Sequence, residues 1–518
     1  MSDRTRRRRS SSRRETSRDT PSSSLLDRQR PYSVIRNKFP PLDPMSEDQL
    51  EKIHHMSMRI LEEQGLKVLS ADARKRLAAV GAEVDDGEQM VKMDRALVMD
   101  LVSKAPAKFT LTPRNPDHAL ELGGNTLNFG MVSGPPNVHD MVRGRRQGNF
   151  SDYCELVKLA QCFNIITFYG NQTIAPVDLA VNTRHLDTYL ACIKYNDKVF
   201  SSMSIGSGRV RDAAQMLAIA RGISLEELES SPSAITNISV NSPRLLDEEM
   251  SDAATTLAEL GQAVIVTPFT LMGAMTPVTV PAALAQQNAE ALLTIALIQS
   301  ANPGAPVVYG SFTSNVDMRS GAPAFGTPEN TWANLAGGQL ARRYNLPHRT
   351  SACNASNIVD AQATYETQMA LWSACLCHGN LIYHAAGWME GGLVASYEKF
   401  IVDVEMLQMM AKFFEPVSFS DDEFALEAID EVGPGGHFFG CDHTMQRYRT
   451  AFHEPLLSDW QNHENWQLAG SKTATERATE LWQQALSEYQ QPFLSEDRME
   501  ELEAYVAKRK EEIGDGEP

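Results

Sequence analysis

Short apolar runs of strand type alternate along the chain with longer stretches in which apolar residues recur at helical spacing. The last three residues of each run include Gly, Ser, Asn or Pro, which favour turns. The eight runs span residues 126–136, 165–176, 198–208, 233–243, 263–275, 305–315, 348–356 and 381–392. Helix-like stretches separate them at 152–163, 185–196, 211–222, 247–261, 281–301, 329–345 and 360–379.

Strands separated by helices predict a parallel sheet with crossover helices. Eight such units within about 290 residues match an α/β fold of the (β/α)8 TIM-barrel type, which typically needs about 250 residues. A doubly wound open sheet is the alternative, although no G-x-G-x-x-G motif follows the first run. We therefore predict a catalytic barrel over residues 121–405.

Three further segments flank the predicted barrel. Residues 1–35 are rich in Arg and Ser and are expected to form a disordered basic tail. Residues 36–120 are predicted to form a small α/β lead-in, in which Ser46 and Gln49 have the spacing of a capping box and Gly65 ends a helix of about 18 residues. Residues 406–518 contain amphipathic stretches and are predicted to form a C-terminal helical cap.

Composition narrows the classes of partner. A net charge of −18 argues against duplex nucleic acid, which needs clustered Lys and Arg. No apolar run approaches the roughly 18 residues of a membrane helix. Seven scattered cysteines fit a reducing compartment better than a disulfide framework. We expect a cytoplasmic protein with neither nucleic acid nor membrane as partner, and the sequence leaves a homo-oligomer open.

The chemistry of a barrel gathers where its strands end. The candidates for substrate binding at these exits are Phe129, Tyr169, Asn171, Phe312, Trp388 and Glu390. Trp388 and Glu390 combine an aromatic face with a carboxylate, which together attract a methylated ammonium ion, and Phe129, Tyr169 or Phe312 would complete a cage. The alternative interpretation is that these aromatics only pack the barrel and that Glu390 pairs with a lysine.

Two other chemistries are weaker. Cys353 and His384 would be a nucleophile and its base if they met across the mouth, as in a barrel lyase or hydrolase. Residues 375–378 and 437–443 have cysteines and histidines at spacings like those of metal ligands, but they form no paired C-x-x-C arrangement. We therefore expect no bound metal.

Four separated motifs carry a resemblance to a known family. They are "NLIYHAAGWMEGGLVASYEK", "DAQATYETQMAL", "GGHFFGCDHT" and "WQLAGSKTATERA". In this order they resemble the trimethylamine methyltransferase family of corrinoid-dependent methyltransferases, from about Phe39 to near the C-terminus. Members of that family are (β/α)8 barrels, which agrees with the count of strand and helix units above.

The resemblance also implies a branch and a cofactor. Trimethylamine enzymes carry pyrrolysine near the end of the seventh strand, where this chain has Ala352, Cys353 and Asn354. The chain therefore resembles the non-pyrrolysine branch, whose members demethylate quaternary amines such as glycine betaine and pass the methyl group to cobalamin. That cobalamin would be free or held by a cognate corrinoid protein. Residues 355–357 depart from the polar pattern of many relatives, which leaves the exact amine open.

The sequence thus predicts an enzyme that moves a methyl group from a small quaternary amine, glycine betaine or similar, to Co(I) cobalamin on a corrinoid protein. A quaternary amine suits a site without a strong acid, because it leaves as a neutral tertiary amine. Asn171 or Asn315 would bind the carboxylate of a betaine. The alternatives are a methyltransferase for trimethylamine or another tertiary methylamine, and a betaine-binding barrel without catalysis.

Overall fold

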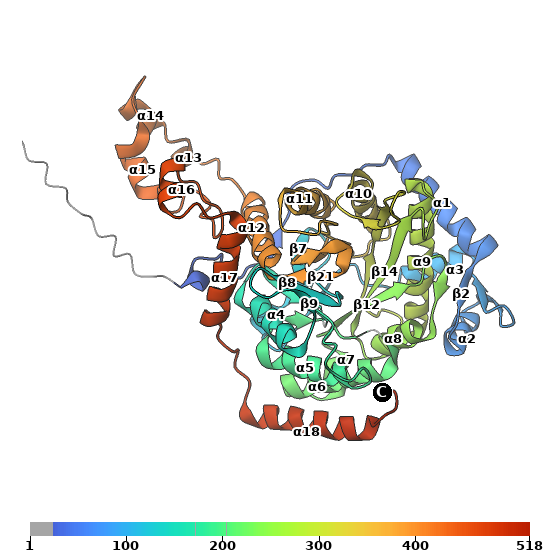
Figure 1. Cartoon of the computed structure of the whole chain (residues 1–518). Helices are drawn as coiled ribbons and strands as arrows, with labels where there is room; N and C mark the ends of the chain where they lie inside the picture. Colours follow the sequence, from blue (N-terminus) through green and yellow to red (C-terminus); the bar gives the residue numbers. More distant parts are fainter. Residues whose placement is uncertain (1–23, 171, 204) are drawn as a thin grey trace, which may run out of the picture.

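The computed structural model describes residues 24–170, 172–203 and 205–518, and within them eight parallel strands form the inner layer (Figure 1). Each strand lies in one of the eight predicted runs, so the predicted barrel is confirmed. The strands are β7 (Thr126–Met131), β10 (Ile166–Tyr169), β11 (Val199–Phe200), β12 (Ile235–Val240), β14 (Ala263–Met272), β15 (Val307–Gly310), β18 (His348–Ser351) and β19 (Leu381–Ala386).

The strands follow the order β11, β10, β7, β19, β18, β15, β14, β12, so the first strand of the barrel, β7, pairs with the last, β19. Between β11 and β12 the described residues form no strand ladder. One isolated parallel bridge joins Ser201 to Ile235, and the backbone N–H of Ser202 donates to the carbonyl of Ile235 over 3.0 Å. The ring of strands is therefore not closed by a ladder, and it has a seam between β11 and β12.

Helices surround the strands, as the crossover pattern predicts. They are α4 (Phe150–Cys162), α5 (Arg184–Tyr195), α6 (Gly206–Arg221), α7 (Leu225–Glu229), α8 (Glu248–Glu259), α9 (Val280–Ala301), α10 (Pro328–Arg343), α11 (Ala361–Leu376) and α12 (Tyr397–Phe413). Helix α9 is buried on all sides from Ala283 to Gln299 and has no polar face. It has this pattern because it packs on the sheet and is itself covered by helices of the lead-in.

The helices of the lead-in form a separate layer beside α8 and α9. Its elements are β1 (Ile35–Arg36), α1 (Glu47–Arg59), β2 (Leu66–Val68), α2 (Ala71–Ala79), β3 (Glu83–Asp85), β4 (Met90–Lys92), α3 (Arg95–Val102), β5 (Phe109–Leu111) and β6 (Leu120–Leu122). The capping box of Ser46 and Gln49 is present, and Gly65 ends the helix after a π-helical turn, as predicted.

The basic tail differs from its predicted extent. Residues 1–23 lie outside the described part of the chain, but Leu25 is buried in the core and Ile35 pairs with Leu127 on β7. These apolar side chains bring residues 24–35 into the fold, because the barrel offers them a surface to cover. The packed chain therefore begins earlier than residue 36.

Several segments that follow the barrel strands form a second layer above the strand ends. A small sheet joins β20 (Trp388–Met389), β21 (Val394–Ser396), β8 (Asn137–Asp140) and β9 (Gly144–Gln147) in that order, linking the exits of the first and last barrel strands. On the other side, β16 (Phe312–Val316) extends the ladder of β14 and pairs with β17 (Pro323–Ala324). The candidate active site lies in this layer.

The C-terminal region is helical, as predicted, but its predicted start at residue 406 falls inside α12. Its helices are α13 (Asp421–Phe424), α14 (Leu426–Val432), α15 (Asp442–Arg447), α16 (His463–Leu468), α17 (Ala474–Glu488) and α18 (Glu496–Ile513). Figure 1 shows α13 to α16 projecting from the barrel, whereas α17 packs on it and α18 runs along α5 and α6. Among the described residues no helix is long and apolar enough to cross a membrane.

Asp212 on α6 fastens α18 to the barrel. Its carboxylate accepts hydrogen bonds from His185 Nε2 over 2.8 Å, Tyr505 Oη over 2.7 Å and Arg509 Nε over 2.8 Å. Burial favours the neutral form of this carboxyl, but the three donors outweigh burial and hold the pKa of Asp212 below its usual value.

We predict that Asp212→Asn lowers the free energy of unfolding by about 1–3 kcal/mol at neutral pH. A depressed folded-state pKa stabilises above the unfolded-state value of about 4 and loses that effect as the pH falls through the folded-state value. Urea unfolding from neutral pH to about pH 3 should therefore show the gap between wild type and variant narrowing. The control is Asp187→Asn, which breaks the more exposed pair with Lys510 on the same helix and should cost less than about 1 kcal/mol. A gap independent of pH would contradict this role.

Candidate active site

Arg349 on β18 points into the barrel near the strand ends. Its neighbours point outward, since His348 bonds to Ser311 and Thr350 bonds to Asn334 on α10. The guanidinium carbon of Arg349 lies 5.0 Å from the ring centre of Phe312 and 4.7 Å from that of Tyr383. A cation is thus placed inside the barrel among aromatic rings.

His384 is turned toward the same place by an irregularity in β19. The register of β19 against β7 shifts between Ile382 and Ala386, and His384 has a φ of 59°, a conformation that non-glycine residues adopt only under constraint. Its ring centre lies 4.2 Å from that of Trp388 and 5.7 Å from that of Phe312. The bulge therefore brings a side chain that regular alternation would direct outward into the mouth.

The hydrogen bond between His384 and Arg349 assigns the tautomer of the imidazole. Nη2 of Arg349 lies 3.4 Å from Nε2 of His384, and arginine can only donate. Nε2 is then the acceptor, so the proton of the neutral ring lies on Nδ1. Burial, followed by the charge of Arg349, holds the pKa of His384 well below its usual value, so the ring stays neutral.

Aromatic rings form one side of the mouth. Phe312 lies 4.9 Å from Phe269, and Trp388 lies 6.0 Å from Phe325 and 6.3 Å from Phe312, all between ring centres. We call this set, together with His384, the aromatic wall: Phe269, Phe312, Phe325, His384 and Trp388. The structure thus brings together two predicted substrate residues, Phe312 and Trp388, and one catalytic candidate, His384.

Trp388 is held from both ends. Its Nε1 donates to the carbonyl of Asn354 over 3.0 Å, and Nδ2 of Asn354 donates to the carbonyl of Trp388 over 2.5 Å. Just before it, Gly387 has a φ of 89°, which suits glycine, and its N–H donates over 2.8 Å to Oδ2 of Asp403. Loop and helix together fix the indole.

Asp403 is itself half of a buried ion pair on α12. Nζ of Lys399 donates to Oδ1 of Asp403, and also over 3.0 Å to Oγ1 of Thr367. Both charged side chains are almost entirely inaccessible. This pair connects α11, α12 and the turn that carries Trp388.

The remaining predicted site residues are not part of the aromatic wall or lie outside the described part of the chain. Phe129 pairs with Ile382 on the outer face of the sheet, and Tyr169 also faces outward, donating from its hydroxyl to the carbonyl of Cys192 on α5. Neither belongs to the aromatic wall. Asn171 lies outside the described residues. Asn315, at the end of β16, accepts a hydrogen bond from Thr327 Oγ1 over 2.7 Å.

Glu390 and Cys353 are constrained by their surroundings. Arg145 on β9 grips Glu390 at both oxygens, with Nε 3.1 Å from Oε1 and Nη2 3.1 Å from Oε2. The carboxylate is thus paired with an arginine rather than the lysine of the alternative interpretation. Cys353 is buried, and burial raises the pKa of its thiol well above the usual value, so the nucleophilic thiolate is disfavoured.

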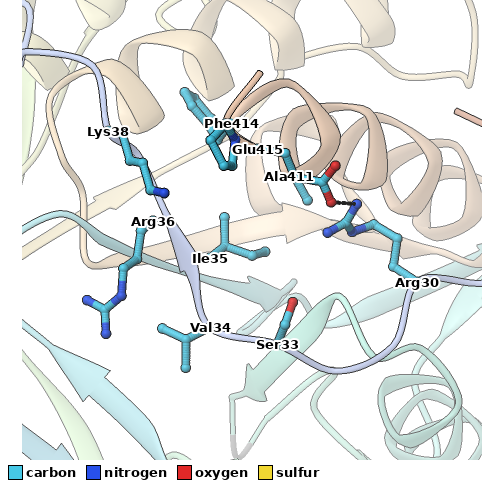
Figure 2. A pocket seen from close by; sticks show the side chains of 10 residues that line it. Arg30, Ser33, Val34, Ile35, Arg36, Lys38, Ala411, Phe414 and Glu415 are labelled. Atoms are coloured by element: carbon cyan, nitrogen blue, oxygen red, sulfur yellow. Dashed lines mark ion pairs between the residues drawn. The ribbon is translucent and has the colours of Figure 1, made fainter. Parts of the chain in front are cut away.

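Two hollows lie at opposite ends of the barrel strands. One of about 180 Å³ opens at the exits of β7, β10, β11 and β12, and its lining includes Ser202, Asn237 and Tyr383. The other, of about 300 Å³, lies between residues 30–38 and the end of α12; Figure 2 shows the ion pair of Arg30 and Glu415 at its side. The second hollow lies near the start of β7, so the first is the one beside the candidate site.

Sequence reasoning missed Arg349 and Phe325. Arg349 stands within the seventh run, where a charge interrupts a strand that is otherwise buried on both faces. That unusual position was the available signal. Phe325 follows β17 in a long connection and carries no comparable signal.

An eight-stranded parallel barrel with polar and aromatic side chains at its strand exits has the architecture of barrel enzymes. The chain belongs to the trimethylamine methyltransferase (MTTB) family, whose model matches residues 5–514.

Relatives across the full length support this assignment. The chain is 36% identical over 479 residues to a glycine betaine methyltransferase of Desulfitobacterium hafniense (strain Y51), covering 92% of this chain and 99% of the relative. It is 29% identical over 479 residues to a trimethylamine methyltransferase of D. hafniense (strain DSM 10664 / DCB-2), covering 90% and 94%. It is 28% identical over 414 residues to a proline betaine:corrinoid methyltransferase of Eubacterium limosum, covering 77% and 84%.

Among solved structures, the monomethylamine methyltransferase of Methanosarcina barkeri superposes with a TM-score of 0.51 at 9% identity, covering 88% of this chain and 90% of that one. At this identity the likeness shows the fold alone.

We predict that Lys399→Met costs about 3–5 kcal/mol of unfolding free energy, because it leaves the buried carboxylate of Asp403 without its counter-charge. The double variant Lys399→Met with Asp403→Leu should recover a large part of that loss, since no unpaired charge remains. Urea unfolding of the three proteins measures both effects. If Lys399→Met unfolds with the wild-type free energy, or if the double variant is less stable than Lys399→Met, the ion pair does not hold this turn.

Proposed function

We propose that this barrel transfers a methyl group from a quaternary amine of the glycine betaine type to the cobalt of a corrinoid protein. The observation that carries the proposal is the aromatic wall at the strand exits, with Trp388 locked in place and His384 neutral. The family and the full-length relatives named for betaines support the same substrate class.

The aromatic wall fits an ammonium ion that has no N–H to donate. Such an ion is bound by aromatic faces, and more strongly where water is excluded. Trp388 is 6% exposed and Phe312 is 8% exposed, so the contact surface is largely dry. Arg349 already lies over Phe312, which leaves the faces of Trp388, Phe325 and Phe269 for the methylated nitrogen.

The reaction requires no proton at the departing nitrogen. The N–CH₃ bond breaks, its electron pair stays on nitrogen, and a neutral tertiary amine leaves. A neutral His384 and a protonated Cys353 thiol suit such a step, because neither acid nor nucleophile is called for. What the chain contributes is placement and exclusion of water, and placement alone can lower a barrier by about 7–11 kcal/mol.

The corrinoid would be presented by a partner protein at the strand exits. When bound, its Co(I) supplies the nucleophile that accepts the methyl group. The hollow beside Tyr383 opens at that end of the barrel. We place the reaction in the cytoplasm, because the seven cysteines are all free.

Methyl transfer can be tested directly by mixing the protein with reduced cobalamin and, separately, glycine betaine, choline, tetramethylammonium or trimethylamine. The expected result is the absorbance spectrum of methylcobalamin with glycine betaine, accompanied by dimethylglycine. Absence of that spectrum with every quaternary amine would refute the proposal. Calorimetric binding of betaine without turnover would instead indicate a binding barrel, and turnover of trimethylamine alone would indicate a tertiary-amine enzyme.

We predict that Trp388→Ala weakens binding of glycine betaine by about 1–2 kcal/mol, through loss of a cation–π contact. Isothermal titration calorimetry measures the change. Trp460→Ala is the matched control, because Trp460 is 71% exposed in the projecting region between α15 and α16 and should bind as wild type does. Unchanged affinity in Trp388→Ala would remove the indole from the substrate site.

Glu390 remains a predicted substrate residue of a weaker kind. Its charge is already compensated by Arg145, so its attraction for a second cation is reduced. Glu390→Gln in the same titration separates two roles of Glu390. If Glu390 only pairs with Arg145, the variant binds betaine with unchanged affinity. If Glu390 contacts the substrate, the variant binds betaine more weakly.

A further inference from the structure

Arg349 carries a buried charge that the chain does not balance. Its exposed fraction is 2%, and its polar contact is with a neutral imidazole. Nε and Nη1 make no hydrogen bond with any described residue. Burial, opposed by Tyr383 and Cys353, lowers the pKa of Arg349 to about 10, which leaves the guanidinium charged at neutral pH.

Other buried cations of this protein are compensated. Among the described residues, Lys399 pairs with Asp403, Arg74 with Asp86 and Arg209 with Glu517, and Nζ of Lys198 donates to the carbonyls of Ala160 and Phe163. A buried charge without such partners is costly and is seldom retained without use. Arg349 therefore has the character of a group whose partner arrives with a ligand.

The surroundings of Arg349 offer one further donor. Nδ1 of His384, which carries the imidazole proton, is also buried and without a hydrogen bond to the described residues. The residue opposite Arg349 in the ladder is Gly310, which presents no side chain toward the guanidinium. Gly310 is required there, because a Cβ would lie 2.0 Å from Oγ1 of Thr267.

The identity of the missing partner follows from these donors. A planar fork with free N–H groups suits a carboxylate, which can accept two parallel hydrogen bonds. The aromatic wall lies beside it, since Phe312 contacts Arg349 on one side and Trp388 on the other. A ligand bridging both features bears a methylated ammonium at one end and a carboxylate at the other.

We propose that Arg349 binds the substrate's carboxylate, with Nδ1 of His384 as a second donor, and that the barrel therefore selects zwitterionic betaines over simple cations. This rests on the proposed function, because it assigns the other half of the same substrate. Choline, tetramethylammonium or protonated trimethylamine would bring a second positive charge beside Arg349, and two like charges in a dry site repel. Arg349 is thus a specificity-determining residue. It has the carboxylate-binding role that was predicted for Asn171 or Asn315.

Two ligands without a transferable methyl group test the carboxylate site separately from catalysis. tert-Butylacetic acid has the shape of glycine betaine with carbon in place of the ammonium nitrogen, and tert-butylacetamide is its uncharged counterpart. Calorimetry on the wild-type protein should show the acid, as its anion, binding at least tenfold more tightly than the amide. This comparison needs no variant, and equal affinities would overturn the assignment.

Variants then locate the effect. Arg349→Gln and Arg349→Met should each weaken binding of glycine betaine and of tert-butylacetate anion at least tenfold, while choline binds no more weakly than to wild type. Arg221→Gln is the matched control, because Arg221 is half-buried at the opposite end of β12, bonded to Ser231 and Ser233. Betaine affinity retained in both Arg349 variants would overturn the assignment.

The two proposals fail in different ways. If tert-butylacetic acid binds in an Arg349-dependent way but no quaternary amine gives methyl transfer, the methyltransferase function is refuted and the carboxylate site is supported. Methyl transfer with equal kcat/KM from choline and glycine betaine would sink the carboxylate site and leave the function standing.

Discussion

The buried ion pair of Lys399 and Asp403 is the interaction on which the mouth of the barrel depends. It neutralises two charges inside α12 and leaves one oxygen of Asp403 free to hold the N–H of Gly387. The turn fixed in this way carries Trp388, whose indole is locked from the other side by Asn354. An aromatic face meant to meet a ligand is thereby set by charges that the ligand never touches, as preorganised sites require.

Electrostatics divides the interior into a neutral part and a positive part. Burial keeps His384 and the Cys353 thiol uncharged, whereas Arg349 retains its charge without a carboxylate beside it. A methylated nitrogen leaves as a neutral amine, so a site without a proton donor at that end loses nothing. The positive end has a different task, because it can orient a ligand by its carboxylate while the aromatic wall holds the methyl groups.

The order of elements could be predicted from the sequence, because each strand run ends in turn residues and each helix has its own apolar period. The capping box at Ser46 is a local signal and was predicted for that reason. The directions of side chains were harder. Phe129 and Tyr169 face the helices because the phase of alternation in a strand buried on both faces leaves no mark in the sequence.

The site could be predicted only in part for the same reason. Phe312 and Trp388 lie side by side, since both follow strand ends that point the same way. His384 reaches the mouth through a bulge with a positive φ, which is a tertiary constraint. Arg349 could not be predicted as a site residue, because what marks it is the lack of hydrogen-bond partners for Nε and Nη1. That lack is visible only when the neighbouring strands are assembled.

The single bridge between β11 and β12 has a mechanical consequence for the ring. Strands joined by full ladders resist separation. The joint of β11 and β12 has only the bridge of Ser201 to Ile235, the backbone hydrogen bond from Ser202 to Ile235 and the contact between the hydroxyls of Ser202 and Thr236, so it separates at the lowest cost. The hollow at the strand exits borders this joint through Ser202 and Asn237. An opening of the ring would therefore start at this joint, which lies opposite β18 and β19 in the strand order, so the strands that carry Arg349 and His384 would keep their pairing.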